Sequence, residues 1–270
     1  MKTLRFALAF TLSLFLSGQA FAHEMQRIRL ATTTSTDNSG LLAVLHPVFE
    51  EKNHIKVDVI AVGTGKALRL GTNGDVDVVM VHAPGAEKKF IAEGSGVERL
   101  PVMHNDFVLL GPAEDPADVK DAASLDEALQ RIVTSNATFV SRGDDSGTHK
   151  KEKALWKSAG IEPQGSWYQA AGQGMGAVLQ MSNNKQAYTL SDRGTYLAFK
   201  DKLSLAVVYE GAPNLLNPYH VILVNPEKHP HVKTELAQRY VDFIRSPEGQ
   251  RIIADFKVNG EALFKPDVVK

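Results

Sequence analysis

Three segments of the sequence combine hydroxyl side chains and glycine with the expected starts of helices. They are residues 31–40 (Ala-Thr-Thr-Thr-Ser-Thr-Asp-Asn-Ser-Gly), 63–66 (Gly-Thr-Gly-Lys) and 141–150 (Ser-Arg-Gly-Asp-Asp-Ser-Gly-Thr-His-Lys). Each follows an apolar run typical of a strand, so each is expected at the carboxyl end of a strand, where α/β sheets bind ligands. The first amides of a helix lack partners and carry partial positive charge. These segments therefore predict a binding site for an anion.

The residue types indicate an anion that accepts hydrogen bonds and donates none. Glycine lets the backbone approach an oxygen closely, and Ser and Thr hydroxyls rotate to donate to it. Within the three segments, Arg142 supplies a guanidinium, a planar cation that can donate two parallel hydrogen bonds to an anion. Six to eight charge-assisted hydrogen bonds would supply on the order of 10 to 20 kcal/mol before the costs of association. Nanomolar affinity, about -12 kcal/mol, is within that range.

Each segment also has a simpler interpretation. Ser and Thr before a helix are common N-caps. Residues 63–66 match only the tail of a phosphate-binding loop, without its upstream glycine. Arg142 could form a surface ion pair with Asp144 or Asp145. The anion hypothesis therefore depends on finding three such segments in one chain.

The elements that must position these segments alternate along the chain. Beta-rich runs are expected over residues 27–31, 56–62, 76–81, 106–110, 138–141, 187–190 and 205–209. Helical spacing of apolar residues marks 41–49 and 125–132, the latter after Ser124, with Glu127 completing a capping box. This alternation predicts an α/β fold with largely parallel sheets.

Two similar segments, 105–112 and 218–226, are short apolar strands that each end in proline. They would suit two crossovers between lobes, one outward and one returning. Lobe one would then comprise residues 23–108 and 218–270, and lobe two residues 109–217. The pattern alone fits equally well with two ordinary strands of a single domain.

The N-terminus predicts export. Lys2 and Arg5 precede an apolar run over 6–16, and small residues follow, so residues 1–22 are expected to be a signal peptide cleaved after Ala22. An uncleaved anchor is the alternative, but the apolar run is shorter than the roughly 20 residues that span a bilayer. The absence of cysteine excludes disulfides and lipidation of an N-terminal Cys. We expect a periplasmic protein.

Composition excludes several classes of function. A formal net charge of -1 over 270 residues leaves no broad basic surface for nucleic acid, so an anion must be recognised locally. The nine histidines include no recognisable metal spacing. We expect no metal cation and no cofactor.

The segments 32–35 and 141–148 together resemble those of the tungstate-binding proteins of bacterial ABC importers. The similarity extends over nearly the whole mature chain, including residues 62–65 and 188–194. It implies an α/β, two-lobed periplasmic solute-binding protein of type II, with two crossover strands and the anion site in the interlobe cleft. It also implies high-affinity tungstate binding and delivery to the membrane permease and ATPase of an ABC importer.

Carried over to this sequence, the resemblance implies a set of ligand-binding residues and no catalytic one. They are Thr33, Thr34, Ser35 and Thr64 from lobe one, and Arg142, Ser146, Gly147, Thr148, Thr189 and Arg193 from lobe two. Asp144 and Asp145 repel an anion, so we assign them to orienting Arg142 and capping the following helix. A ligand that keeps a proton could instead donate it to either of them.

Alternatives remain open for the ligand and for the class of protein. Molybdate, phosphate and sulfate could bind to the same fold, and the sequence does not report the size of the cavity. A periplasmic hydrolase could use a loop serine, but there is no Gly-x-Ser-x-Gly elbow and spacing assigns no base. A sensor would need an output domain that the chain lacks. One site per chain favours a monomer.

Overall fold

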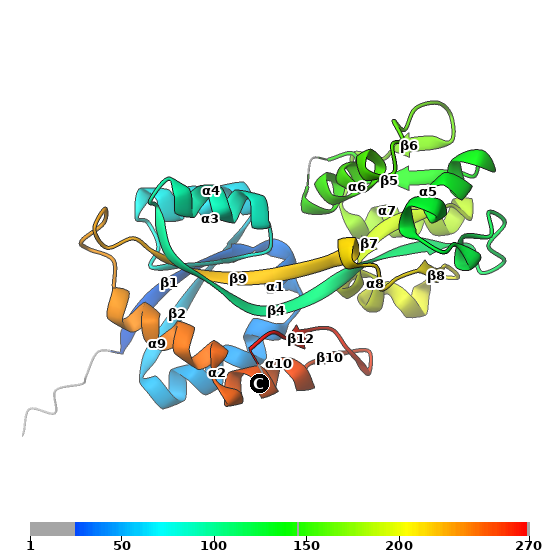
Figure 1. Cartoon of the computed structure of the whole chain (residues 1–270). Coiled ribbons are helices and arrows are strands. Elements are labelled where there is room, and N and C mark those ends of the chain that lie inside the picture. The colour runs from blue at the N-terminus through cyan, green and yellow to red at the C-terminus, as the bar shows by residue number, and fades with distance from the viewer. Residues whose placement is uncertain (1–24, 145, 269–270) are drawn as a thin grey trace, which may run out of the picture.

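The computed structural model describes residues 25–144 and 146–268. The expected signal peptide, its cleavage point after Ala22, and Asp145 lie outside the described residues. Two lobes are joined by the long strands β4 (Gly96–Gly111) and β9 (Leu216–Val224) (Figure 1). The α/β, two-lobed fold with two crossover strands is confirmed.

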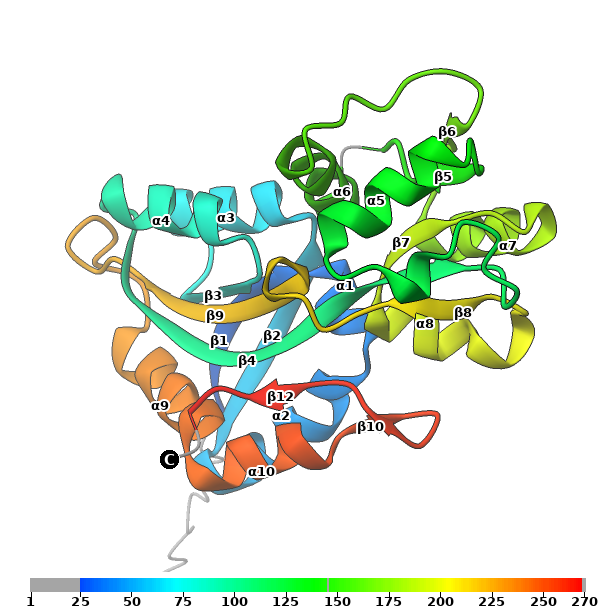
Figure 2. The same ribbon diagram turned by 45° about the vertical axis from the view of Figure 1, so that its right-hand side comes forward.

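Lobe one is built on a mixed sheet. Strand β1 (Gln26–Thr33) pairs in parallel with β2 (Ile55–Val62) and β3 (Val78–Val81), whereas β3–β9, β9–β4 and β4–β12 (Lys265–Pro266) are antiparallel. The prediction of largely parallel sheets is wrong for the crossover strands, because the returning strand runs against the outgoing one. Helices α3 (Thr64–Asn73) and α4 (Pro84–Ala92) cover one face, and α2 (Leu41–Asn53), α9 (Thr234–Arg245) and α10 (Pro247–Asp255) cover the other (Figure 2).

Lobe two continues from the same crossover strand. β4 pairs with β9 up to Asp106 and with β7 (Thr189–Asp192) from Phe107, and β8 (Ala206–Tyr209) joins it there. This change of partners lies two residues before the predicted limit at 108, and the lobe limits themselves stay a prediction. The remaining elements are β5 (Phe139–Ser141), β6 (Tyr168–Ala170), α5 (Leu125–Thr134), α6 (Gly147–Ser158), α7 (Met175–Lys185), α8 (Arg193–Phe199) and the 3-10 turns Val119–Asp121, Lys200–Lys202 and Pro213–Leu215.

The C-terminal segment makes a further connection between the lobes. Its hairpin, β10 (Lys257–Val258) and β11 (Glu261–Ala262), lies beside α8. Asn259 donates its side-chain amide to the carbonyl oxygen of Leu197 at 2.6 Å, and Lys200 forms an ion pair with Glu261. Lobe two is thus held to both the crossover strands and the end of the chain.

Local sequence explains where the elements begin. The amide of Glu127 donates to the Ser124 hydroxyl at 3.1 Å, and the Glu127 carboxylate accepts from the Ala123 amide at 2.9 Å, which starts α5 as the capping box predicts. Buried apolar side chains form three clusters, one of which continues from the lobe-one sheet to Val178 and Leu197 in lobe two. Among the described residues, no helix has the length and apolarity needed to cross a membrane.

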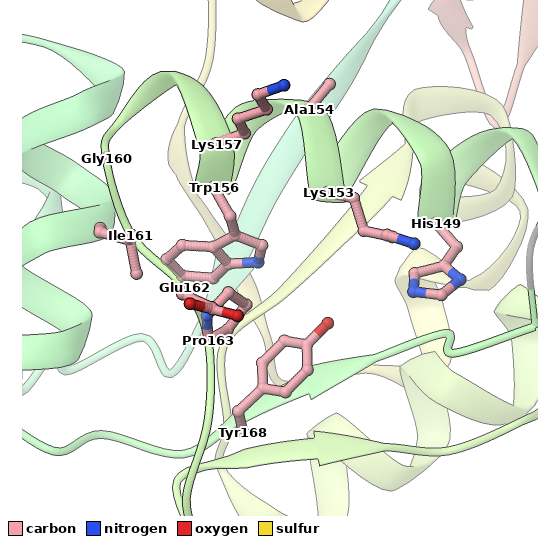
Figure 3. A pocket seen from close by; sticks show the side chains of 10 residues that line it. All are labelled: His149, Lys153, Ala154, Trp156, Lys157, Gly160, Ile161, Glu162, Pro163 and Tyr168. Atoms are coloured by element: carbon pink, nitrogen blue, oxygen red, sulfur yellow. The ribbon is translucent and has the colours of Figure 1, made fainter.

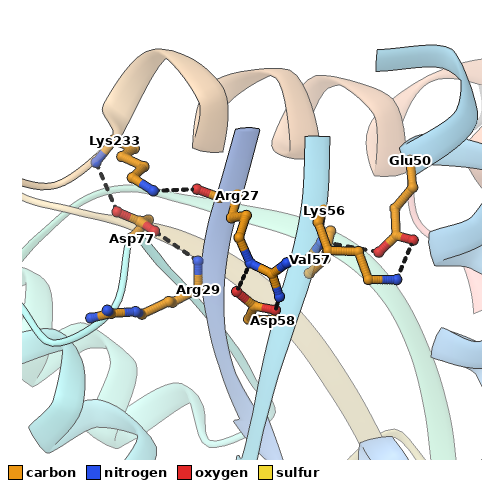
Figure 4. A network of polar contacts seen from close by, with 8 residues as sticks. All are labelled: Arg27, Arg29, Glu50, Lys56, Val57, Asp58, Asp77 and Lys233. Atoms are coloured by element: carbon orange, nitrogen blue, oxygen red, sulfur yellow. Dashed lines mark hydrogen bonds and ion pairs between the residues drawn. The ribbon is translucent and has the colours of Figure 1, made fainter. Parts of the chain in front are cut away.

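Asp77 ties the middle of the lobe-one sheet to α9 (Figure 4). Its carboxylate, 7% exposed, accepts the backbone amides of Arg29 on β1 and Lys233 before α9, both at 2.7 Å. The Lys233 ammonium donates to the carbonyl oxygen of Arg27 at 2.7 Å. A buried carboxylate therefore satisfies two amides that no regular ladder or helix bond reaches.

Replacing Asp77 by Ala leaves both amides without acceptors, at about 1 to 3 kcal/mol each. We expect the free energy of unfolding, measured by urea denaturation, to fall by about 2 kcal/mol or more. Asp58→Ala is the matched control, since it removes only a surface ion pair with Arg27 and should cost below about 1 kcal/mol. Equal losses in the two variants would show that the Asp77 contacts do not stabilise the fold.

Candidate functional site

The first two predicted segments meet at one edge of the lobe-one sheet. β1, β2 and β3 are parallel, so their carboxyl ends lie together, and Thr33 at the end of β1 pairs with Val62 at the end of β2. Thr64 follows two residues after Val62, and His82 comes directly after β3. The sheet therefore brings Thr33, Thr64 and His82 to the same edge.

Thr33 is the centre of a cluster of hydroxyls. It caps the short helix α1 (Thr34–Asn38), accepting the Thr36 amide at 3.2 Å. Its Oγ1 lies 2.6 Å from the Thr36 hydroxyl and 3.0 Å from that of Ser35. Thr33 and Thr36 are buried, whereas Thr34 and Ser35 are exposed. The segment expected as a loop is thus partly helical, and Ser35 presents the accessible hydroxyl of the cluster.

Helix α3 begins at Thr64, and no side chain caps its N-terminus. The cap residue is Gly63, which has no side chain to bond the first amides. Within this turn, the amides of Lys66 and Ala67 donate to the carbonyl oxygen of Gly63. The start of α3 can therefore donate to an outside acceptor.

The third segment surrounds the start of α6 in lobe two. The Arg142 guanidinium donates to one Asp144 oxygen at 2.5 Å, and the Ser146 amide donates to the other at 3.2 Å. Burial alone would raise the pKa of Asp144, but the hydrogen bonds from Ser146 and Arg142 lower it below the ordinary value. Asp144 is therefore an anion that orients Arg142 and supports the helix start, as expected; Asp145 is outside the described residues.

Arg142 has one donor to which the described residues offer no acceptor. Its side chain is 18% exposed, and its Nε atom is buried with no hydrogen-bond acceptor in the described part of the chain. Buried donors are almost always paired, so an orphaned one requires an explanation. An oxygen atom from a bound anion would supply the missing acceptor.

A buried network holds the backbone of this segment in place. The Ser141 hydroxyl donates to Glu152 at 2.8 Å and accepts the Gly143 amide at 3.2 Å. Gly143 has a φ of +63°, and a Cβ there would lie 2.9 Å from the Cβ of Ala170, so only glycine fits. Burial raises the pKa of Glu152, although hydrogen bonds from Tyr168, Ser141 and Trp156 oppose this.

The other predicted residues of this segment form the first turn of α6. Ser146 is the N-cap and accepts the His149 amide at 3.3 Å, while its side chain and its amide both hydrogen-bond to Asp144. Gly147 is exposed and Thr148 is buried. The structure therefore brings Arg142, Ser146, Gly147 and Thr148 together around one helix N-terminus.

Thr189 and Arg193 are placed differently. Thr189 is 1% exposed and donates its hydroxyl to the Val140 carbonyl oxygen at 2.7 Å. Arg193 donates to both oxygens of Asp106, at 2.6 and 2.7 Å, and to Glu210 at 2.5 Å. The hydrogen bonds that Arg193 donates to Asp106 raise the pKa of its guanidinium above the ordinary value. In this structure both donors already have acceptors. The contact with a ligand that the resemblance implies for them stays a prediction, and it would require these hydrogen bonds to break.

His82 is a polar residue of this edge that the sequence patterns did not single out. Its Nε2 lies 3.1 Å from the Thr33 hydroxyl and 3.2 Å from that of Ser35, and its Nδ1 lies 3.0 Å from Asn217 Oδ1. The residues after it are Ala83 and Pro84, so no hydroxyl or glycine marked the spot. The sequence signal that could have indicated His82 is its position directly after an apolar strand, where α/β sheets bind ligands.

A pocket of about 750 Å³ lies between α6 and the segment that follows it (Figure 3). Its lining includes Trp156, Pro163 and Tyr168, and His149 is its contribution from the third segment. A volume far above that of a tetrahedral oxyanion, with a mostly apolar lining, does not suit such a ligand. Among the described residues, no three His, Asp or Glu side chains form a group that could hold a metal ion.

Comparison with known proteins agrees with this geometry. A family model described as a PBP superfamily domain matches residues 21–248. The tungstate-binding protein TupA of Peptoclostridium acidaminophilum is 48% identical over 247 residues, covering 90% of this chain and 86% of that protein. The resemblance inferred from the sequence motifs is therefore confirmed.

Solved structures extend the comparison to three dimensions. TupA from Desulfovibrio alaskensis G20 superposes with a TM-score of 0.85 at 47% identity, covering 90% of this chain and 99% of that one. The tungstate ABC transporter structure from Geobacter sulfurreducens gives a TM-score of 0.76 at 57% identity, covering 85% of this chain and 98% of that one. The chain belongs to the PBP superfamily and, within it, to the family of the tungstate-binding proteins.

Proposed function

We propose that this protein binds tungstate in the periplasm and delivers it to the permease and ATPase of an ABC importer. The observation that carries the proposal is the buried Nε of Arg142, which has no acceptor among the described residues, beside the first turn of α6. Relatives named for tungstate binding cover most of the chain. We propose a monomer, since one anion site per chain needs no second copy.

The proposed donor set comes from both lobes. Lobe one supplies the Ser35 hydroxyl and the start of α3 at Thr64, and lobe two supplies Arg142 with the amides of Gly147 and Thr148. An anion that accepts from both groups binds the closed arrangement better than an open one and so favours closure. Because the donors offer hydrogens and Asp144 is ionised, a fully deprotonated dianion suits them better than one that keeps a proton.

Selection against sulfate must come from size. Tungstate, molybdate and sulfate are all tetrahedral dianions with four acceptor oxygens. A site spaced for longer metal–oxygen bonds leaves the contacts to sulfate stretched, and hydrogen bonds weaken steeply with poor geometry. In this proposal the longer metal–oxygen bonds of tungstate therefore give it a higher affinity than sulfate.

One arrangement favours a second candidate function, a serine hydrolase. Ser35, His82 and Asn217 have the order of a nucleophile, a base and an orienting group, with contacts of 3.2 and 3.0 Å. However, Nε2 lies as close to the Thr33 hydroxyl, and a neutral Asn217 cannot stabilise an imidazolium as a carboxylate does. We propose that the protein does no chemistry on its ligand.

Tungstate should raise the melting temperature, because a ligand that binds only the folded state stabilises it by mass action. At 1,000 times Kd we expect a gain of roughly 8 to 16 °C by differential scanning fluorimetry. Sulfate and phosphate at the same concentration serve as controls and should leave the melting temperature nearly unchanged. Equal stabilisation by phosphate would overturn the tungstate assignment.

Arg142→Ala should weaken tungstate binding, measured by calorimetry, by a factor of roughly 10 to 150, since one charge-assisted bond is worth about 1.5 to 3 kcal/mol. Arg193→Ala is the matched control. Its guanidinium is occupied by Asp106 and Glu210, so we expect lower stability but an affinity within about threefold of the original. Unchanged affinity in the first variant removes Arg142 from the site; an equal loss in the second places Arg193 there.

Hydrolysis of 4-nitrophenyl acetate distinguishes the two candidate functions. A Ser35 nucleophile would give turnover above the rate of the Ser35→Ala variant. We expect the two rates to coincide, and tungstate to have no effect on either. A Ser35-dependent rate that tungstate inhibits would establish the hydrolase.

A further inference from the structure

His82 is held on three sides between the lobe-one sheet and the returning crossover strand. Nε2 faces the Thr33 and Ser35 hydroxyls, Nδ1 faces Asn217, and the ring stacks on Tyr219 with centroids 4.5 Å apart. Asn217 and Tyr219 both belong to β9. The ring therefore has one orientation relative to the hydroxyl cluster.

The contacts of Asn217 determine which nitrogen of His82 carries hydrogen. The Asn217 side-chain amide donates to Asn105 Oδ1 at 2.8 Å, so its oxygen faces His82 and accepts from Nδ1. In the neutral ring Nε2 is then an acceptor with one lone pair. It takes the hydrogen of one of the two neighbouring hydroxyls.

This arrangement competes with anion binding. A hydroxyl has one hydrogen, and a Thr33 or Ser35 hydroxyl that gives it to Nε2 cannot give it to an oxyanion. A proton on Nε2 reverses the direction, because the ring then donates to the hydroxyls and frees their hydrogens. It also adds a positive charge beneath the cluster, which an anion favours.

We propose that His82 is a positioning residue that directs the hydroxyl hydrogens of Thr33 and Ser35, so that an oxyanion at this edge binds together with a proton on Nε2. The inference rests on the proposed function, because it requires the oxyanion to lie at the hydroxyl cluster.

The surroundings of His82 give the sign of the pH dependence. Burial lowers the pKa of His82, and the hydrogen bond to Asn217 and the carboxylates of Asp192 and Glu87 raise it in part. Asp192 ends β7 and Glu87 lies in the first turn of α4. The groups of β1 and β9 that contact the ring, Thr33, Asn217 and Tyr219, carry no charge at pH 7. The free ring is therefore neutral at pH 7. A bound dianion raises the pKa of His82, so affinity falls as pH rises through the bound-state pKa.

The test measures tungstate affinity by calorimetry from pH 6.5 to 8.5, with net proton uptake obtained from buffers of different ionisation enthalpy. The wild-type protein should take up protons on binding and lose affinity with rising pH, by at most about tenfold per pH unit for one proton. His82→Asn retains a donor for Asn217 and removes Nε2. It should show a smaller pH slope and less proton uptake, while any titration of tungstate itself cancels between variants.

His54→Asn is the matched control. His54 is exposed, lies after α2 away from the site and has a φ of +54°, a conformation that Asn adopts readily. It should behave as the wild type, and thermal unfolding without anion verifies that each variant is folded. Binding with the same pH slope and proton uptake in His82→Asn overturns the role of His82 but leaves the proposed function standing. Absence of tungstate binding by the wild type overturns the proposed function itself.

Discussion

The antiparallel pairing of β4 with β9 is the constraint on which the rest of the structure depends. It carries the chain from one lobe to the other and back, and its register sets Asn105 opposite Asn217 and Asp106 opposite Leu216. Asn217 fixes His82 on the lobe-one side, and Asp106 fixes Arg193 on the lobe-two side. Because side chains alternate along a strand, a shift of one residue would displace both partners at once.

Charge in the candidate site is nearly balanced before any ligand arrives. Arg142 faces Asp144, and Arg193 faces Asp106 and Glu210. With a formal net charge of -1, the chain also lacks a broad field that would attract anions in general. Recognition must then depend on where the Arg142 donor, the hydroxyls and the helix amides are placed. Their distances and directions discriminate between anions of equal charge.

Local sequence predicted the elements well, because the apolar runs and helix caps that define them are themselves local. Ser124 and Glu127 begin α5 as their spacing indicates, and the two proline-ended segments are the crossover strands. The direction of pairing was not predictable, because it depends on how the crossovers return. In the site, Arg142 and Ser146 share a segment and could be found together. The contacts of His82 could not be predicted, since its partners Thr33 and Asn217 are distant in sequence and meet only through the sheet.

The Nε atom of Arg142, for which residues 25–144 and 146–268 supply no acceptor, has a consequence for how this protein could be altered. A buried donor without an acceptor lowers the stability of the empty protein by the cost of its desolvation. Any nearby substitution that supplied an internal acceptor would make the fold more stable and occupy the place of the ligand. At this atom the stability of the empty protein and the affinity for the ligand therefore oppose each other. Selection for stability alone would favour substitutions that abolish binding.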